Sequence, residues 1–282
     1  MTQPMVPSMI PPASRRLDHA QYRAGIASAV LRAVPEETPV AFTYRGCSYA
    51  VMMATPDDLE DFAIGFTLTE GLANTRAEID DVTIRAQKDG VVLDIGLAEA
   101  AMDRFWSRRR LLTGPSGCGL CGIESIAQAL RPVVSVGGDS AFSPADIAEA
   151  VAALPRHQAL HRETRAVHAA ALWRPSDGIV TLREDIGRHN ALDKLVGALA
   201  RSGNTMSGGI LLLTSRISVE LVQKACAAGA TMIVAISAPT ALAIRIADAA
   251  GMTLIGIARD DGFELFTHPE RVATTAPASN AA

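Results

Sequence analysis

No apolar stretch of this 282-residue sequence approaches the roughly 20 residues of a membrane-spanning helix. The amino terminus has neither the basic start nor the continuous apolar run of a secretory signal. The net charge is only −4 and there is no long stripe of lysine and arginine, so the composition gives no sign of nucleic-acid binding. We therefore expect a cytoplasmic protein that binds neither nucleic acid nor a membrane.

Cysteine is scarce as well, with four residues in the chain. A chain of this length buries enough apolar surface to be stable without disulfides or a structural metal, and disulfide frameworks are uncommon in the cytoplasm. Cys47 lies in a predicted hairpin, and Cys226 lies on the apolar face of a predicted helix, where it suits core packing. Cys118 and Cys121 form a CxxC pair in the glycine-rich stretch "GPSGCGLCG" and need another explanation.

Three interpretations fit this pair. Structural zinc requires four ligands, and the sequence offers a single cysteine pair with no histidine at metal-binding spacing beside it, so we predict no metal site. A thioredoxin-type redox pair follows a strand, whereas residues 106–117 predict a loop. A sulfur carrier needs a cysteine that ionises easily, and a helix starting near Gly122 together with Arg108–Arg110 would stabilise a thiolate. Spacing alone leaves the redox and sulfur-carrier interpretations open.

Periodicity divides the rest of the chain into two parts. Alternating patterns predict hairpins at 39–54 and 80–97, with a helix between them that is capped by Thr55 and has Pro56 at its first position. After residue 166, two strands and a helix lead into a regular alternation of apolar strands and helices. Buried strands that alternate with helices are typical of parallel sheets.

We therefore expect an α/β fold, with a mixed, largely parallel sheet flanked by helices and an α+β N-terminal part. The predicted organisation is a disordered tail at 1–20, an N-terminal α+β subdomain at 21–112, a mobile CxxC loop at 113–122, an α/β core at 123–272 and a disordered tail at 273–282.

Polar residues follow the predicted strands of this core. Arg188 and His189 begin a helix directly after Glu184 and Asp185, and further strands are followed by Ser215 and Arg216, by Ser237 and Thr240, and by Arg259 and Asp260. Ligands of open α/β sheets bind beyond the carboxyl ends of strands, so these groups predict a ligand that carries phosphate or a nucleotide. The sequence has no GxGxxG and no P-loop, which argues against an ordinary NAD or ATP site.

The alternative is that these residues are solvated loops and capped helix ends. His168, within an apolar strand, is by itself more typical of a core residue than of a ligand or base.

Several longer motifs, taken in order, resemble one family. They are "EETPVAFTYRG", "VMMATPDDLEDFAIGFTLTEG", "GCGLCG", "TRAVHAAAL", "EDIGRHNALDK", "TSRISVELVQKA", "SAPTALAIRIADAAGMTLIGIAR" and "THPERV", and they span about residues 34–272. On these motifs the chain resembles the FdhD-type sulfur carriers, the accessory sulfurtransferases of formate dehydrogenases.

The resemblance implies a fold and a function. Its core would be similar to that of cytidine deaminases without their chemistry, which agrees with the absence of an H-x-E motif paired with P-C-x-x-C. Such proteins receive sulfur from a cysteine desulfurase as a cysteine persulfide. They pass it to a molybdenum or tungsten bis-guanine-dinucleotide cofactor, which is the bound substrate and is then inserted into the formate dehydrogenase catalytic subunit. The resemblance also implies a homodimer.

Residue by residue, Cys118 matches the persulfide-bearing position and Cys121 its partner. The expected cofactor-binding residues are Ile257, Ala258, Arg259, Asp260, Asp261 and Gly262, together with His168, Arg188, His189, Ser215 and Arg216. This sequence departs from the family pattern at Arg165, where small residues are common, and at the two acids Asp260 and Asp261. A cofactor-binding chaperone without sulfur chemistry is the alternative function.

Overall fold

The computed structural model describes residues 9–112, 133–138 and 140–273, except for the side chains of residues 110–112. The N-terminal part contains a four-stranded sheet in the order β4-β3-β6-β5. Its strands are β3 (Thr38–Tyr44), β4 (Cys47–Ala54), β5 (Ile79–Gln87) and β6 (Gly90–Leu97). The hairpins predicted at 39–54 and 80–97 are therefore confirmed, and β3 and β6 join them as a parallel pair.

One face of this N-terminal sheet is covered by α1 (Leu59–Thr69) and α2 (Glu99–Leu112). Phe42 of β3 stacks on Phe66 of α1 with ring centroids 4.1 Å apart, and Phe62 meets it edge to face at 4.9 Å. Alternate residues of β3 and β6 complete this core, which explains the period-2 pattern of the sequence.

The predicted start of α1 is wrong. The helix begins at Leu59 after Asp58, which has a left-handed backbone (φ 51), and Pro56 lies outside it. Thr55 is not a cap because its groups are used elsewhere: its amide donates to Asp185 Oδ2 at 3.0 Å, and its hydroxyl accepts from the amide of Ile186 at 3.2 Å. A contact across the two halves of the chain therefore competes with the local capping signal.

The C-terminal part is built on a six-stranded sheet in the order β12-β11-β10-β9-β7-β8. Its strands are β7 (His168–Arg174), β8 (Gly178–Asp185), β9 (Ile210–Leu213), β10 (Met232–Ala235), β11 (Thr253–Arg259) and β12 (Gly262–Thr267). The mixed α/β fold is confirmed, with its parallel part confined to the adjacent strands β9, β10 and β11. Strands β7, β8 and β12 pair antiparallel. A cytidine deaminase type of core stays a prediction.

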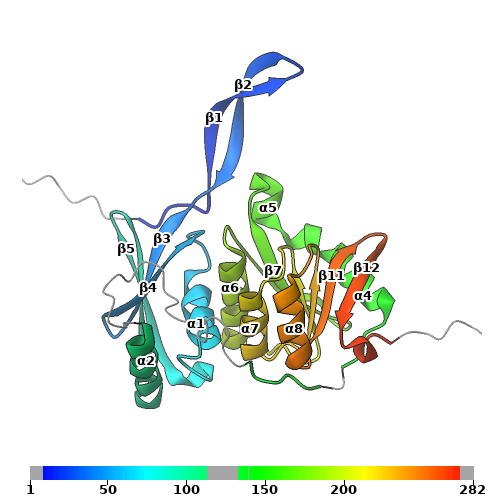
Figure 1. Cartoon of the computed structure of the whole chain (residues 1–282). Helices are drawn as coiled ribbons and strands as arrows, with labels where there is room; N and C mark the ends of the chain where they lie inside the picture. Colours follow the sequence, from blue (N-terminus) through cyan, green and yellow to red (C-terminus); the bar gives the residue numbers. More distant parts are fainter. Residues whose placement is uncertain (1–8, 113–132, 139, 274–282) are drawn as a thin grey trace, which may run out of the picture.

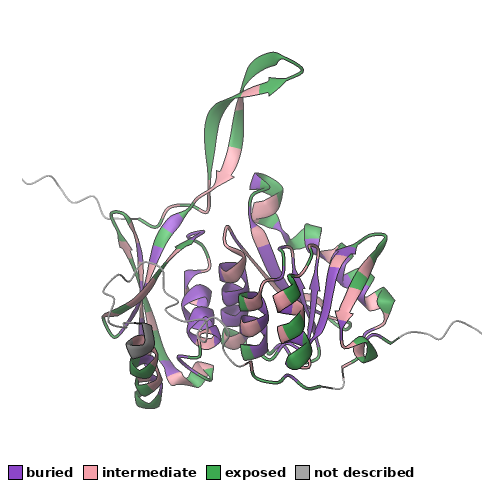
Figure 2. Cartoon of the chain, in the orientation of Figure 1, coloured by how far each residue is buried: buried purple, intermediate pink, exposed green. Residues whose placement is uncertain are grey.

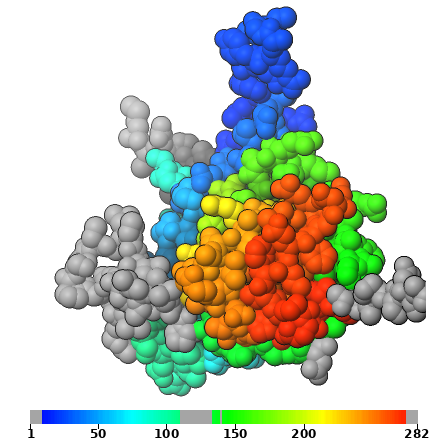
Figure 3. All heavy atoms as spheres, turned by 45° about the vertical axis from the view of Figure 1, so that its right-hand side comes forward, coloured from blue at the N-terminus to red at the C-terminus, as the bar shows by residue number. Residues whose placement is uncertain are grey.

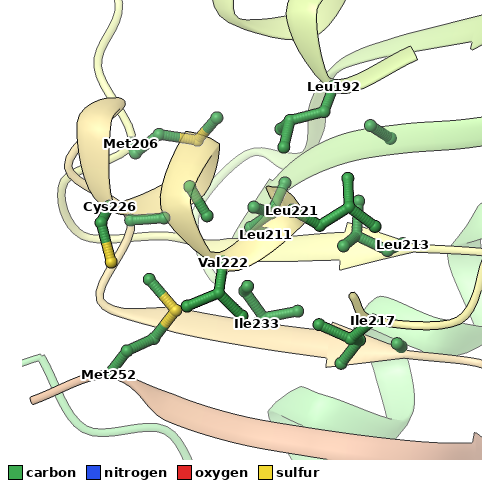
Figure 4. Packing of buried hydrophobic residues seen from close by; sticks show 14 of the residues in the cluster. Leu192, Met206, Leu211, Leu213, Ile217, Leu221, Val222, Cys226, Ile233 and Met252 are labelled. Carbon is green, nitrogen blue, oxygen red and sulfur yellow. The ribbon is translucent and has the colours of Figure 1, made fainter. Parts of the chain in front are cut away.

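Helices cover both faces of this sheet (Figure 1). On one face lie α6 (Arg188–Arg201), α7 (Val219–Ala227) and α8 (Ala241–Ala249), and on the other lies α4 (Pro144–His157). Figure 4 shows the packing under α7, where Val222 and Cys226 lie against Ile233 and Met252. Cys226 is thus a core residue, as its place on the helix predicted.

The two parts of the chain share a close helix contact. A Cβ at Gly65 of α1 would overlap the carbonyl of Asp193 in α6, and a Cβ at Gly197 of α6 would overlap the carbonyl of Asp61 in α1. The two helix backbones approach so closely that only glycine fits at these two positions. The N-terminal part is therefore fixed onto the helical layer of the C-terminal sheet.

The sequence prediction missed four elements, two strands and two helices. Residues 14–20, assigned to a disordered tail, lie in β1 (Ser14–Arg23), which pairs with β2 (Ile26–Pro35) in a projecting two-stranded ribbon. Figures 1 and 2 show this ribbon extending from the body with most of its surface exposed. The loop assigned to residues 106–112 is the second half of α2, and a short helix, α5 (Ala159–Thr164), precedes β7.

These misses have physical causes. The ribbon has both faces largely exposed, so it carries no clear alternation of buried and exposed residues. The run of arginines at 108–110 was assigned to a loop, whereas it lies on a helix that is anchored by the buried side chains of Ala101 and Phe105. The helix predicted at 122–132 and the tail at 274–282 lie outside the described residues, and two 3₁₀ turns at Arg76–Glu78 and Pro269–Arg271 complete the described fold.

Candidate functional site

Most of the predicted site residues lie along one edge of the six-stranded sheet, which we call the carboxyl edge. It holds the carboxyl ends of β9, β10 and β11. Strand β7 runs antiparallel to β9, so its first residue, His168, lies at this edge opposite Asp185, the last residue of β8. Ser215 and Arg216 follow β9 here, and Arg188 and His189 begin α6 here.

The stretch Ile257–Gly262 reaches the same edge but is further along it. The amide of Ile257 donates to the carbonyl of Ser237, just after β10, at 3.2 Å. Neighbouring strands are about 4.8 Å apart, so β11 lies about 10 Å from β9. Arg259, Asp260 and Asp261 are exposed where β11 turns into β12. The structure therefore groups His168, Arg188 and His189 closely and leaves the acidic turn at a distance that only an extended ligand would span.

Asp185 lies beside His168, Arg188 and His189 and is held in place by several contacts. Its buried carboxylate forms an ion pair with Lys194 Nζ at 2.7 Å and accepts hydrogen bonds from the amides of Thr55 (3.0 Å) and Gly187 (2.7 Å) and from Asn190 Nδ2 (2.9 Å). Four donors hold this carboxylate in one orientation. Asp185 therefore positions the start of α6, and its oxygens are already occupied by groups of its own chain.

Glu184 is also committed to structure. Its two carboxylate oxygens accept hydrogen bonds from the amides of Leu160 and His161, at 2.7 and 2.8 Å. These amides belong to the first turn of α5 and would otherwise have no hydrogen-bond acceptor. Glu184 thus fixes α5 beside the first residue of β7.

The two histidines of the edge are uncharged at neutral pH. Burial and, to a smaller extent, the neighbouring Arg188 together lower the pKa of His189 to about 4. Burial and then Arg188 also lower the pKa of His168. His189 Nε2 lies 3.4 Å from Ser218 Oγ and 3.8 Å from Glu220 Oε2. These rings can donate or accept a hydrogen bond without adding charge.

Two arginines supply the positive charge. Arg188 Nε is buried and has no hydrogen-bond partner in the described part of the chain. A buried donor without a partner is costly, so Arg188 Nε is a candidate to pair with a group that a ligand brings. Arg216 is exposed, and its carbonyl accepts from the buried hydroxyl of Ser215 at 3.1 Å. The cations and neutral imidazoles together favour an anionic ligand.

The backbone is unusual at the start of the acidic turn. Ile257 has φ 53, a left-handed conformation that a β-branched residue rarely adopts. It lies in an irregular segment of the β11–β12 pairing between Gly256 and Arg259. Such irregular positions re-aim the chain at the ends of strands. Here the irregularity gives way to the exposed turn that carries Asp260 and Asp261.

Two clusters of buried charges among the helices were missed from the sequence. Lys224 of α7 contacts both oxygens of Asp193 in α6, at 2.9 and 3.0 Å, and also Glu70 and Thr69 at the end of α1. Asp61 of α1 binds Arg183 and Arg201, each at 2.7 Å. The available signal was the presence of charged residues on the core face of α6, within "NALDKLV".

The cysteines divide into two groups. Cys118 and Cys121 lie outside the described residues. Of the other two, Cys226 is buried, which raises the pKa of its thiol to about 12, and Cys47 is half-buried in the first hairpin. A thiol with such a raised pKa is a poor nucleophile. Among the described residues no group of histidines, cysteines and carboxylates could hold a metal ion, and no helix could span a membrane.

A described cavity lies away from the predicted site residues. A cavity of ≈ 520 Å³ lies at the opposite end of the C-terminal part, between the ends of α1, α6 and α7. Its lining includes Leu68, Val134, Leu199 and Met206, and none of the predicted site residues. This partly open, largely apolar cavity therefore lies apart from the carboxyl edge.

Fold and edge together define a two-part α/β protein that presents a cationic, phosphate-compatible surface beside the start of α6. The chain belongs to the FdhD/NarQ family, whose model matches residues 35–273. It is 49% identical over 259 residues to the sulfur carrier protein FdhD of Agrobacterium fabrum, covering 92% of this chain and 96% of that protein. It is 45% identical over 263 residues to the sulfur carrier protein FdhD of Cupriavidus necator, covering 93% and 91%.

A solved structure shares the fold. The crystal structure of a putative formate dehydrogenase accessory protein from Desulfotalea psychrophila matches with a TM-score of 0.73 and covers 93% of this chain and 100% of that one. At 23% identity this likeness concerns the fold alone.

Proposed function

We propose that this protein is a sulfur carrier for formate dehydrogenase maturation. It takes sulfur from a cysteine desulfurase as a persulfide on Cys118 and transfers it to a molybdenum or tungsten bis-guanine-dinucleotide cofactor. The names of the similar proteins support the sulfur-carrier role. The structural observation that carries the cofactor part is the unpartnered, buried Nε of Arg188 at the carboxyl edge.

Sulfur loading is a thiol–persulfide exchange. The Cys118 thiolate attacks the outer sulfur of the desulfurase persulfide, the S–S bond of that persulfide breaks, and the desulfurase cysteine leaves as a thiolate. One sulfur atom moves and no net oxidation occurs. Cys226 cannot compete for this sulfur, because its thiol stays protonated and buried.

Sulfur delivery uses the second cysteine. The Cys121 thiolate attacks Cys118 Sγ, a Cys118–Cys121 disulfide forms, and the outer sulfur leaves as sulfide to become a ligand of the substrate metal. The two electrons that reduce this sulfur come from the two cysteines. A dithiol reductant must then reduce the disulfide before the next cycle.

The carboxyl edge would bind the nucleotide ends of the cofactor. Arg188 and Arg216 suit phosphate oxygens, because a guanidinium donates to an anion through charge-assisted hydrogen bonds. Asp260 and Asp261, unsuited to phosphate, suit guanine, whose N1–H and 2-amino groups are donors that a carboxylate accepts. A divided site of this kind would bind the phosphates at one part of the edge and guanine at another.

Intact-protein mass spectrometry tests the sulfur step. The protein is incubated with a cysteine desulfurase and cysteine, beside C118A, C121A and the matched control C47A. We expect the parent, C121A and C47A to gain the mass of one sulfur that a reductant removes, and C118A to gain none.

An absence of sulfur gain in the parent would refute the carrier role. Full activation of formate dehydrogenase by the variant with both Cys118 and Cys121 replaced by serine would instead establish a cofactor-binding chaperone. Turnover of a dithiol substrate without any binding of GDP would establish a disulfide reductase.

A further inference from the structure

The cavity of ≈ 520 Å³ between the ends of α1, α6 and α7 has an apolar floor. Val196, Leu199 and Met206 line it, and each of these side chains is at most 7% exposed. The volume lies within the roughly 300–1,000 Å³ of pockets that hold small molecules. The cavity is therefore large enough for an organic ligand.

Small residues at the helix ends leave this space open. Gly71 follows the end of α1 and Gly203 follows the end of α6, and both glycines have a left-handed backbone, with φ 67 and φ 71. A left-handed residue ends a helix and turns the chain away from its axis. Ala200 in the last turn of α6 and Ala227 at the end of α7 also line the cavity, and each carries only a methyl group. Little side-chain volume therefore fills the space between the three helix ends.

Arg76 adds a cation to the lining of this cavity. Its Nη1 donates to the carbonyl of Ile79 at 2.5 Å, and it forms no ion pair with any described residue. Other arginines of the N-terminal part are each paired with a carboxylate, namely Arg45, Arg85, Arg104 and Arg108. The charge of Arg76 is therefore available beside an apolar floor.

The carboxylate that is closest to Arg76 in the sequence, Glu78, is already occupied. It pairs with Arg104 and accepts a hydrogen bond from the amide of Asn74 at 2.6 Å. Asn74 and Thr75 line the cavity directly before Arg76, so two neutral hydrogen-bonding side chains and the cation lie in one short segment of the lining. A ligand would therefore meet an apolar floor and a polar, cationic wall at residues 74–76.

We propose that this cavity binds a small amphiphilic monocarboxylate, with its apolar chain against the floor and its carboxylate on Arg76. A guanidinium donates two parallel hydrogen bonds to a carboxylate, and these bonds are stronger where water is partly excluded. One arginine balances one negative charge, so a monocarboxylate suits the cavity better than a phosphate ester, which carries more charge. Medium-chain fatty acids are ligands of this chemistry. None of the predicted site residues lines the cavity, so this site is independent of the proposed nucleotide site.

Isothermal titration calorimetry of the full chain with decanoate tests the role of the cation. We expect R76Q to bind decanoate roughly 10-fold more weakly than the parent, because the carboxylate loses its charged partner. R245Q is the matched control and should bind like the parent, since Arg245 is exposed on α8 and does not line the cavity. Helix α8 lies at the surface in Figure 3, where it is orange. Decanol, which has no carboxylate, should bind R76Q and the parent equally.

Further titrations test the apolar floor. A200L and A227L each add a larger side chain to the lining and are expected to weaken decanoate binding by roughly 10-fold, whereas A249L, at the exposed end of α8, should have no effect. Octanoate, which is shorter by two methylene groups, should bind the parent roughly 10-fold more weakly than decanoate. Thermal unfolding by circular dichroism establishes that each variant is folded, and R76Q should bind GDP like the parent.

Three results would each overturn the proposal. They are the absence of decanoate binding to the parent at about 1 mM, equal decanoate affinities of R76Q and the parent, and equal affinities of both leucine variants and the parent. A short peptide that ends in leucine and binds more tightly than decanoate would also overturn it, because the cavity would then accept the carboxyl terminus of a polypeptide instead of a small molecule.

Discussion

At the scale of single residues, the charged groups of the carboxyl edge differ in how many hydrogen-bond partners their own chain provides. Asp185 and Glu184 are saturated with hydrogen bonds from their own chain, whereas Arg188 Nε has no partner among the described residues. The neutral His168 and His189 lie beside that arginine. One cation of the edge is therefore available for a ligand under the proposed function, and its surroundings are fixed.

Arg188 is expected to contribute directly to nucleotide binding. R188Q should weaken the binding of GDP by roughly 10-fold or more, because it removes a charge-assisted hydrogen bond worth about 1.5–3 kcal/mol. Isothermal titration calorimetry measures this, with R156Q on the exposed end of α4 as the matched control. Equal GDP affinity in R188Q and the parent would show that Arg188 does not contact the nucleotide.

His189 makes stability depend on pH. Its pKa is about 4 in the folded protein and 6.5 in a free side chain, so the unfolded chain binds more protons between these values and stability falls as pH decreases. From pH 7 to pH 5 this group removes about 1–2 kcal/mol from the free energy of unfolding. H189Q should lose that much less than the parent in urea titrations at the two pH values. An equal loss in both proteins would contradict the shift.

At the scale of elements, buried charges join the helices. Lys224 of α7 binds Asp193 of α6 and the end of α1, while Arg183 and Arg201 bind Asp61 of α1. The glycines at the α1–α6 crossing allow these short contacts, because they bring the two backbones together. The arrangement of the helical layer therefore depends on charge pairing as well as on apolar packing.

Removal of one partner of the Lys224–Asp193 pair should strongly destabilise the protein. K224M leaves Asp193 buried without its cation and is expected to lower the free energy of unfolding by about 3–5 kcal/mol. The double variant K224M/D193L removes both charges and should recover part of that loss. Urea titrations of the parent, both single variants and the double variant measure the coupling. A K224M protein as stable as the parent would mean that the pair contributes little.

The local sequence pattern predicted the elements that depend on local interactions or that have a strong hydrophobic period. The two hairpins and the alternation of strands and helices were recovered because buried and exposed residues alternate along them. The start of α1 was not, since Thr55 bonds to Asp185 and Ile186, which are more than 100 residues away. The ribbon was missed because exposed strands leave no hydrophobic period.

The same distinction applies to the site. Polar residues at strand ends predicted the carboxyl edge, because parallel strands bring their ends to one side of a sheet. The sequence could not show that Glu184 and Asp185 are occupied, since their partners lie in α5 and in the N-terminal part. It also could not show that Ile257 adopts a left-handed backbone.

At the scale of the whole molecule, distinct features occupy distinct surfaces. The carboxyl edge is charged, the cavity of ≈ 520 Å³ is largely apolar and lies at the opposite end, and the ribbon projects from the N-terminal sheet. The proposed nucleotide site therefore lies away from the cavity. Substitution of an exposed side chain of the projecting ribbon should leave GDP affinity unchanged, which the same calorimetric titration of L31E in β2 would show.

The hydrogen bonds of Asp185 and Lys224 also determine when the site can form during folding. Thr55 and Asp185 are separated by 130 residues, and Thr69 and Lys224 by 155. Closing such long loops costs conformational entropy before any contact compensates for it, so these bonds form late. During synthesis, the N-terminal part must wait for most of the chain before α6 is fixed in place. A fragment that ends before Lys224 would lack the cluster, and the arginine and histidines of the edge would remain without their support.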